Sequence, residues 1–233
     1  MNRDTESMLL LLLGGAVLRI SLDDTFLRYV RGWTRPCLVL GATVLIVLAL
    51  VSLWRERRAS HPRPDDHDHR GPAVAWLLLL PVFAIFLVAP PALGSYAASR
   101  ASNNVVQPRQ GEFPALPAGD PVTTTLTDYA TRAIWDQGRS LRGRRVRLVG
   151  FVSPRPGGGV YLARLVITCC AADARPIKIT VRGAPAGFVT DTWVEVVGEY
   201  AGLDGPAGRS AEIPVIKAES VRTVAAPAEP YES

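Results

Sequence analysis

Apolar residues are concentrated in the first 95 residues of the chain, in three runs. Two of them, residues 36–54 and 72–94, contain 19 and 23 residues without a charge. Since a helix needs about 20 apolar residues to cross a bilayer, both predict transmembrane helices. The remaining run, residues 7–22, is interrupted by Arg19. This run can cross the membrane only if the Arg19 side chain reaches the membrane surface with its charged group. We therefore expect a membrane α-helical part with two or three transmembrane helices in residues 1–95.

The pattern changes twice after the last apolar run. Residues 96–121 are rich in proline and glycine and show no periodicity, which predicts a linker. Residues 122–233 then alternate between apolar and polar positions, as β-strands do, with glycine-rich connections. The expected strands are residues 146–152, 160–168, 176–182, 193–200 and 213–224. Five strands of this kind predict a small all-β domain, with an OB-like barrel as the first choice.

One short amphipathic helix is expected immediately before the strands, over residues 120–138. Thr127 or Asp128 is a suitable N-terminal cap. Its apolar face is formed by Tyr129, Ala130, Ala133 and Ile134.

The charge distribution agrees with this division into a membrane part and a soluble part. The net charge of +5 divides into 12 basic against 9 acidic residues in 1–119, and 14 against 12 in 120–233. In the first part the arginines flank apolar runs, where they act as orientation signals. The second part is nearly neutral, so we expect no nucleic-acid partner. The composition also excludes a simple cytosolic enzyme, a disulfide-rich secreted module and a disordered chain.

The densest basic flank sets the expected topology. The segment Arg55 to Arg58 carries three arginines next to a predicted span. Because positive charge is retained in the cytoplasm, we place the following loop there, which makes the protein a multi-pass cell-membrane protein with its C-terminal domain outside the cytoplasm.

All three histidines lie in that loop, close to aspartates. His61, His67 and His69 are separated by prolines, arginines and carboxylates. Imidazole with nearby carboxylates is a ligand set for zinc, so the loop is a candidate metal site. The alternative is a solvated polar connector.

A pair of adjacent cysteines is the main candidate for chemistry in the second half. Cys169 and Cys170 lie at the end of a predicted strand, and Asp173 follows in a turn. Adjacent strand residues point to opposite faces, so both thiols reach one ion only where the chain turns. Four readings stay open: a soft-metal site, a vicinal disulfide with a redox role, a surface that passes metal on, or two cysteines that only pack. Cys37, at the head of a predicted span, is expected to be a packing residue.

No known catalytic arrangement is present. The sequence has no hydrolase elbow, phosphate-binding loop, dinucleotide fingerprint or paired carboxylates. We therefore expect a protein that is not an enzyme.

Several segments resemble one family of bacterial membrane proteins. The matching segments are Trp76–Pro81, Val88–Ser95, Val146–Val152, Ala163–Arg164, Ile167–Ala174, Asp191–Gly198 and Pro227–Tyr231. They resemble the YcgQ-like proteins, permease subunits with a C-terminal domain of unknown function, and the Cys-Cys-Ala-Ala-Asp element is the most specific mark.

The resemblance implies a partner and a process. The partner is a separate multi-span permease of the YcgR-like type, and the process is metal-ion homeostasis, particularly of zinc. Cys169, Cys170 and Asp173 are the site positions that it implies. The expected function is a membrane accessory subunit of a permease; a docking module without a ligand and a thiol–disulfide element are the alternatives.

Overall fold

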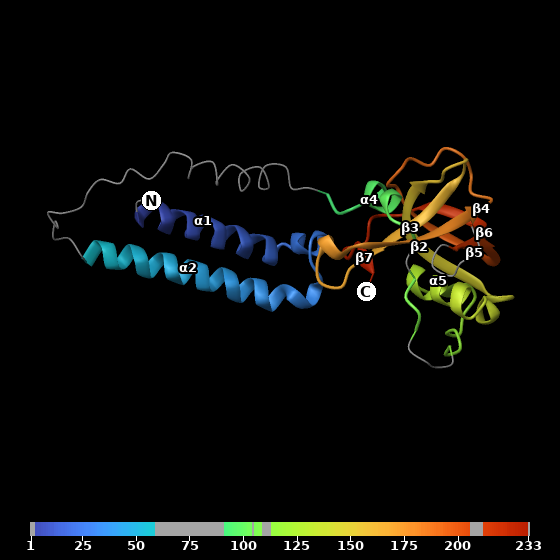
Figure 1. The fold of residues 1–233 in the computed structure, drawn as a ribbon, viewed down its shortest axis with the longest axis horizontal. Coiled ribbons are helices and arrows are strands. Elements are labelled where there is room, and N and C mark those ends of the chain that lie inside the picture. The colour runs from blue at the N-terminus through green and yellow to red at the C-terminus, as the bar shows by residue number, and fades with distance from the viewer. Residues whose placement is uncertain (1–2, 59–90, 104, 109–112, 206–211, 233) are drawn as a thin grey trace. The chain divides into compact units, whose positions relative to one another are not determined.

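The computed structural model divides the chain into two units, Met1–Pro91 and Ala92–Ser233 (Figure 1). The residues that it describes are 3–58, 91–103, 105–108, 113–205 and 212–232. The predicted span at residues 72–94 lies outside the described residues up to position 90.

The first unit contains a pair of helices, α1 (Arg3–Leu22) and α2 (Arg35–Arg58). Two short 3-10 turns, η1 (Thr25–Arg28) and η2 (Gly32–Thr34), connect them. Buried small residues lie seven positions apart in each helix, at Ser7, Gly14 and Ser21 in α1 and at Ala42 and Ala49 in α2, and Ala16 of α1 is buried as well. At Gly14 an added methyl group would lie 2.9 Å from Ile46 Cγ1, so the close approach requires glycine. Small residues at a helix contact are the packing mode of membrane helices.

One helix among the described residues is long and apolar enough to cross a membrane. It covers Gly32–Arg55, with a mean hydropathy of 2.6 over its most apolar window. This agrees with the span predicted at residues 36–54. The apolar part of α1, Ser7–Leu22, is shorter than a full span, so a second crossing there stays a prediction.

The second unit is built on a five-stranded β-barrel. Its strands are β2 (Arg145–Pro154), β3 (Val160–Val166), β4 (Arg175–Arg182), β5 (Trp193–Asp204) and β6 (Ile213–Thr223). They close in the order β2–β3–β4–β6–β5 and back to β2. The pair β4–β6 is parallel and the other pairs are antiparallel. The five predicted strands are confirmed, and the closure is consistent with an OB-like barrel.

Helix α5 (Leu126–Trp135) fills one end of the barrel and contacts all five strands (Figure 1). Its predicted apolar face is buried in the core. The predicted cap at Thr127 or Asp128 is wrong. Thr125, in an extended conformation, is the cap, because its side-chain oxygen accepts from the Asp128 amide at 3.0 Å. The helix begins at Leu126 because the chain before it forms a short strand instead.

The segment expected to be a linker contributes to the barrel unit. Helix α4 (Ser95–Arg100) packs against the outside of β2, β3 and β4. The buried Lys178 ammonium donates to the carbonyls of Ala98 and Ala101, at 3.2 and 2.7 Å. Asn103 donates to and accepts from the Lys178 backbone. The linker is predicted because residues 96–121 are rich in proline and glycine and have no periodicity. Neither property indicates long-range hydrogen bonds such as these.

Two short strands at the ends of the barrel unit complete the sheet. Strand β1 (Val122–Thr123) pairs in parallel with β2, and β7 (Tyr231–Glu232) pairs in parallel with β3. The buried Glu232 carboxylate accepts from the amides of Leu126 and Thr127, both at 2.9 Å. A carboxylate at this position satisfies free amides at the start of α5 and complements the helix dipole.

We expect Glu232→Gln to lower the free energy of unfolding by about 1–2 kcal/mol, because one of the two accepting oxygens is replaced by an amide NH2 group, which cannot accept a bond from a backbone N–H. Urea denaturation of the full chain in detergent measures this change. The matched control is Glu229→Gln, since only the backbone carbonyl of Glu229 bonds to Arg164. An equal loss in both variants would show that the cap is unimportant.

Candidate metal centre

The candidate site lies on the loop that joins β3 to β4. The chain leaves β3 at Val166, passes through the two cysteines and makes a single 3-10 turn, η5 (Ala171–Asp173), before β4 begins at Arg175. The start of this loop is fixed to β7, because the Ile167 amide donates to the Glu232 carbonyl at 3.2 Å. The turn predicted after the cysteines is present as η5, and both cysteines lie after the end of β3.

The Asp173 carboxylate closes this loop from within. Oδ1 accepts from the Thr168 amide at 2.8 Å, and Oδ2 accepts from the Cys169 amide at 2.9 Å. These two amide bonds hold the pKa of Asp173 below its ordinary value. The carboxylate is therefore an anion that is fixed on the loop by its backbone.

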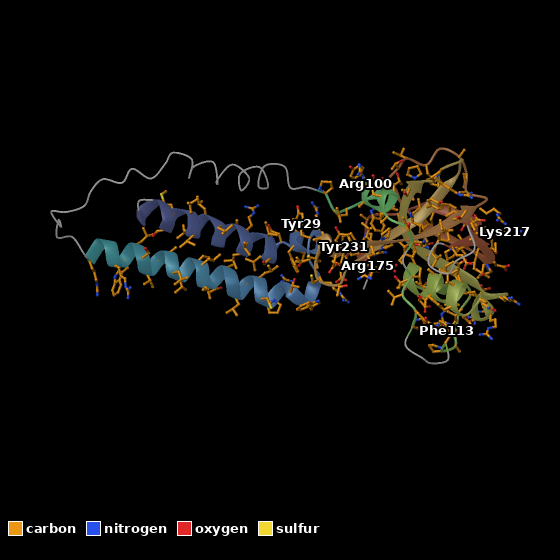
Figure 2. The ribbon with its side chains drawn as sticks, viewed as in Figure 1. Tyr29, Arg100, Phe113, Arg175, Lys217 and Tyr231 are labelled. Atoms are coloured by element: carbon orange, nitrogen blue, oxygen red, sulfur yellow. The ribbon has the colours of Figure 1, made fainter. Side chains whose placement is uncertain are left out.

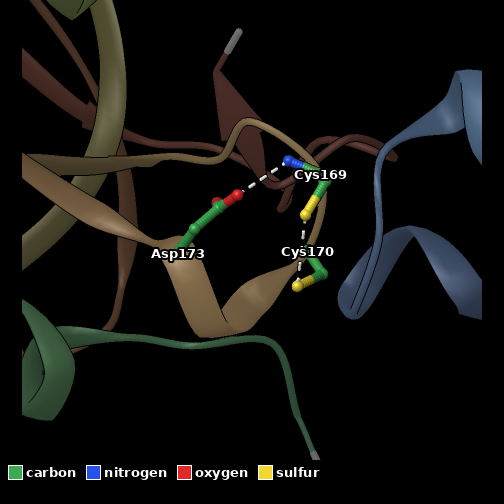
Figure 3. Close-up of side chains that lie close together, drawn as sticks. All are labelled: Cys169, Cys170 and Asp173. Atoms are coloured by element: carbon green, nitrogen blue, oxygen red, sulfur yellow. Dashed lines mark hydrogen bonds between the residues drawn. The ribbon is translucent and has the colours of Figure 1, made fainter.

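Both thiols lie on the same side of the loop (Figure 3). The Cys169 thiol donates to the Cys170 sulfur at 3.5 Å, and both cysteines are free. One oxygen of Asp173 and the two sulfurs all lie within 4.8 Å of one another. Two sulfurs that bind one tetrahedral zinc ion at about 2.3 Å each are about 3.8 Å apart. The observed distance between the two sulfurs, 3.5 Å, is close to that value. The loop would therefore not have to rearrange for both sulfurs to bind one ion.

The surroundings keep Cys169 protonated. Its bond to Cys170 and the neighbouring Asp173 carboxylate raise the pKa of the Cys169 thiol to about 11. Negative charge and hydrogen bonding to the neutral form both oppose the bare thiolate. A cation at the same place reverses this effect, because it stabilises the thiolate directly.

The nearest basic residue in sequence is Arg175, at the start of β4. Its side chain lies at the end of the barrel that carries the cysteine loop, whereas Lys217 on β6 lies at the other end (Figure 2). Arg175 is exposed, so it adds positive charge near the loop without occupying it.

The remaining sequence-predicted residues are the three histidines of the loop at 61–70 and Cys37. His61, His67 and His69 lie outside the described residues. Cys37 is exposed in α2 of the first unit. The amides of Thr168 and Cys169 could not be identified from residue types. The only sign of their bonds in the sequence is an aspartate five residues after Thr168 and four residues after Cys169.

A cleft of about 430 Å³ lies where β2 and β3 separate, and its lining includes Arg164 and Glu232. The Arg164 guanidinium donates to the carbonyls of Val149, Glu229 and Pro230. Since Glu232 caps α5, both charged groups serve the structure. The cysteine loop therefore remains the better candidate site.

We expect the Cys169 amide bond to weaken only at low pH. Because the pKa of Asp173 is lowered, the bond is present above the ordinary aspartate value of 3.8 and is lost as pH falls through the lower value in the folded protein. Labelling the chain with ¹⁵N-cysteine gives three amide signals, and the Cys169 signal should titrate below pH 3.8 while that of Cys37 stays constant. A midpoint at or above that value, or the same titration in Asp173→Asn, contradicts this role.

The comparisons with known proteins concern the barrel unit. Residues 123–232 match the family model described as the DUF1980 C-terminal domain. This range begins in β1 and ends in β7, so it contains the whole barrel and the cysteine loop. No curated protein and no solved structure matches the chain.

Proposed function

We propose that this protein is a membrane-anchored accessory subunit of a permease, and that its barrel binds a soft or borderline metal ion, zinc first, through Cys169, Cys170 and Asp173. The role is binding rather than catalysis. The barrel stands outside the cytoplasm, and the process is metal-ion homeostasis. The partner is a multi-span permease of the YcgR-like type.

The observation that carries the metal assignment is the convergence of three donor atoms on one exposed loop. Thiolates select zinc, copper(I) and similar ions over magnesium or calcium. The two amide bonds of Asp173 also fit a ligand role, because metal-binding carboxylates are commonly oriented by hydrogen bonds from an outer shell.

The membrane part of the proposal is supported by α2 and by the family match. Helix α2 has the length and the apolar composition of a span. The match to the DUF1980 C-terminal domain is consistent with the resemblance to the YcgQ-like proteins. A permease partner follows from that resemblance.

One observation favours a second candidate, an interaction module without a ligand. Both Asp173 oxygens already bond to the loop backbone, and this is sufficient reason for an aspartate at this position. In that case the cysteines only pack and the barrel docks on the permease.

We expect the purified full chain to bind one zinc ion, and each of Cys169→Ser and Cys170→Ser to weaken binding by more than the roughly 10–100-fold cost of losing an outer-shell partner. The loss follows because a thiolate ligand is replaced by a hydroxyl. Competition with a chromophoric chelator, in detergent, measures the affinity.

Cys37→Ser is the matched control, since Cys37 is the third and remaining cysteine of the chain. Zinc binding that survives loss of both Cys169 and Cys170, or no binding in the unaltered chain, would refute the metal site and favour the interaction module.

Zinc affinity should rise with pH. Cys169 is protonated below a pKa of about 11, so every binding event at neutral pH releases its proton. The apparent affinity should therefore increase by at least about tenfold per pH unit between about pH 6.5 and 8.5. Titrations at several pH values measure the slope, and a pH-independent affinity would mean that Cys169 is not a ligand.

A further inference from the structure

The barrel unit begins inside the uncharged run that predicts the span at residues 72–94. Ala92 packs against the core cluster that contains Tyr231, and the Leu93 amide donates to the Tyr231 hydroxyl at 3.0 Å. The 20 residues 72–91 then remain for the span, and a bilayer needs about that number. The predicted span is therefore followed by the barrel without a spacer.

Hydrogen bonds fix the start of α4 to the turn before β5. The Ser95 amide and hydroxyl donate to the two oxygens of the Asp191 carboxylate, at 2.6 and 2.9 Å, and Ser95 is buried. Asp191 is held in turn by its own amide, which donates to the Val152 carbonyl at 2.9 Å. Residues 92–95 and the turn before β5 thus form one fixed surface of the barrel unit.

Exposed apolar side chains gather on this surface. Among its described residues, the barrel unit exposes five large apolar side chains: Leu93, Tyr96, Val106, Val189 and Leu203. Leu93 and Tyr96 flank Ser95, and Val189 lies in the turn that carries Asp191, because the Thr192 amide donates to the Val189 carbonyl at 3.2 Å. Tyr96 and Val189 are 71% and 72% exposed. Apolar side chains that gather at one place are typical of a protein or membrane contact.

Basic side chains adjoin these apolar ones. The Arg100 guanidinium lies 4.7 Å from the centre of the Tyr96 ring, and both side chains are exposed. Figure 2 shows Arg100 and Arg175 at the same end of the barrel, whereas Lys217 lies at the other end. A tyrosine next to an arginine suits a bilayer surface, because the ring lies at the level of the headgroups and the guanidinium attracts anionic lipid.

We propose that the surface formed by Leu93, Tyr96, Arg100 and Val189 rests on the phospholipid bilayer, with Arg100 at the lipid phosphates. The bilayer is the partner that the chain itself supplies, since the predicted span ends at these residues. The inference deepens the membrane part of the proposed function and rests on that span, but it is independent of the metal site. The cysteine loop then lies near the lipid, because Ala174 packs against the same core cluster as Ala92.

Fluorescence quenching in lipid nanodiscs tests this in the full chain, purified without a partner. The three native cysteines are replaced by serine, and one new cysteine carries the fluorophore, in Pro91→Cys, Thr190→Cys or Lys217→Cys. The discs contain phosphatidylethanolamine, phosphatidylglycerol and a lipid with a nitroxide on its headgroup. We expect quenching at positions 91 and 190, and an unquenched probe at position 217, which lies at the other end of the barrel (Figure 2).

The double variant Tyr96→Ser, Arg100→Gln separates a surface that binds lipid from one that is only tethered nearby. We expect the ratio of lipid-bound to free barrel to fall by at least about fivefold, the factor for one basic residue at an anionic surface. Quenching at position 190 should fall with it, while quenching at position 91 stays. The matched control is Leu203→Ser with Lys217→Gln, which removes an exposed apolar side chain and a basic one from β5 and β6.

The other outcomes identify which step is wrong. Quenching at position 91 without quenching at position 190 overturns the inference and leaves the predicted span intact. Equal quenching at positions 190 and 217 overturns it too, because no particular end of the barrel then faces the lipid. Quenching at position 190 that the double variant does not lower means that the tether alone holds the barrel near the membrane, and the inference fails. An unquenched probe at both 91 and 190 refutes the predicted span together with the inference.

Discussion

The barrel unit depends on the way strand β2 divides its hydrogen bonds. Strand β2 pairs with β5 from Arg145 to Phe151, but it pairs with β3 only from Phe151 to Pro154. Strands β2 and β3 separate before Phe151 in β2 and after Ala163 in β3. The backbone groups on the facing edges of these two segments therefore have no partner in the barrel. A buried backbone group that lacks a hydrogen bond is costly, so the open seam has to be filled.

Residues from both ends of the domain fill the seam. Strand β1 pairs with the first half of β2, β7 pairs with the second half of β3, and Arg164 donates to the Val149 carbonyl between them. Glu232 then connects β7 to the helix that closes the barrel. Because β7 also bonds to Ile167, the closure of the barrel and the position of the cysteine loop depend on the same short strand.

The sequence predicts the barrel strands well because each has period-two alternation bounded by glycine-rich turns. It also identifies the buried face of the helix at Tyr129, Ala130, Ala133 and Ile134. It misses α4, β1 and β7, since elements of two to six residues have too few positions for a period. At the site, the residue types indicate Cys169, Cys170 and Asp173. Only the fold shows that Asp173 binds the loop backbone and that the sulfurs are 3.5 Å apart.

A cysteine pair suggests either thiol–disulfide exchange or metal binding, and the raised pKa of Cys169 bears differently on the two. Thiol–disulfide exchange begins with attack by a thiolate, and reactive cysteines have a lowered pKa because of a nearby positive charge or helix N-terminus. Cys169 instead lies beside a carboxylate and a second sulfur, which raise its pKa to about 11. The same two groups become favourable when a divalent cation is present, because each supplies it with an electron pair. The carboxylate at this position thus disfavours thiol–disulfide exchange, and it is compatible with the metal binding that we propose.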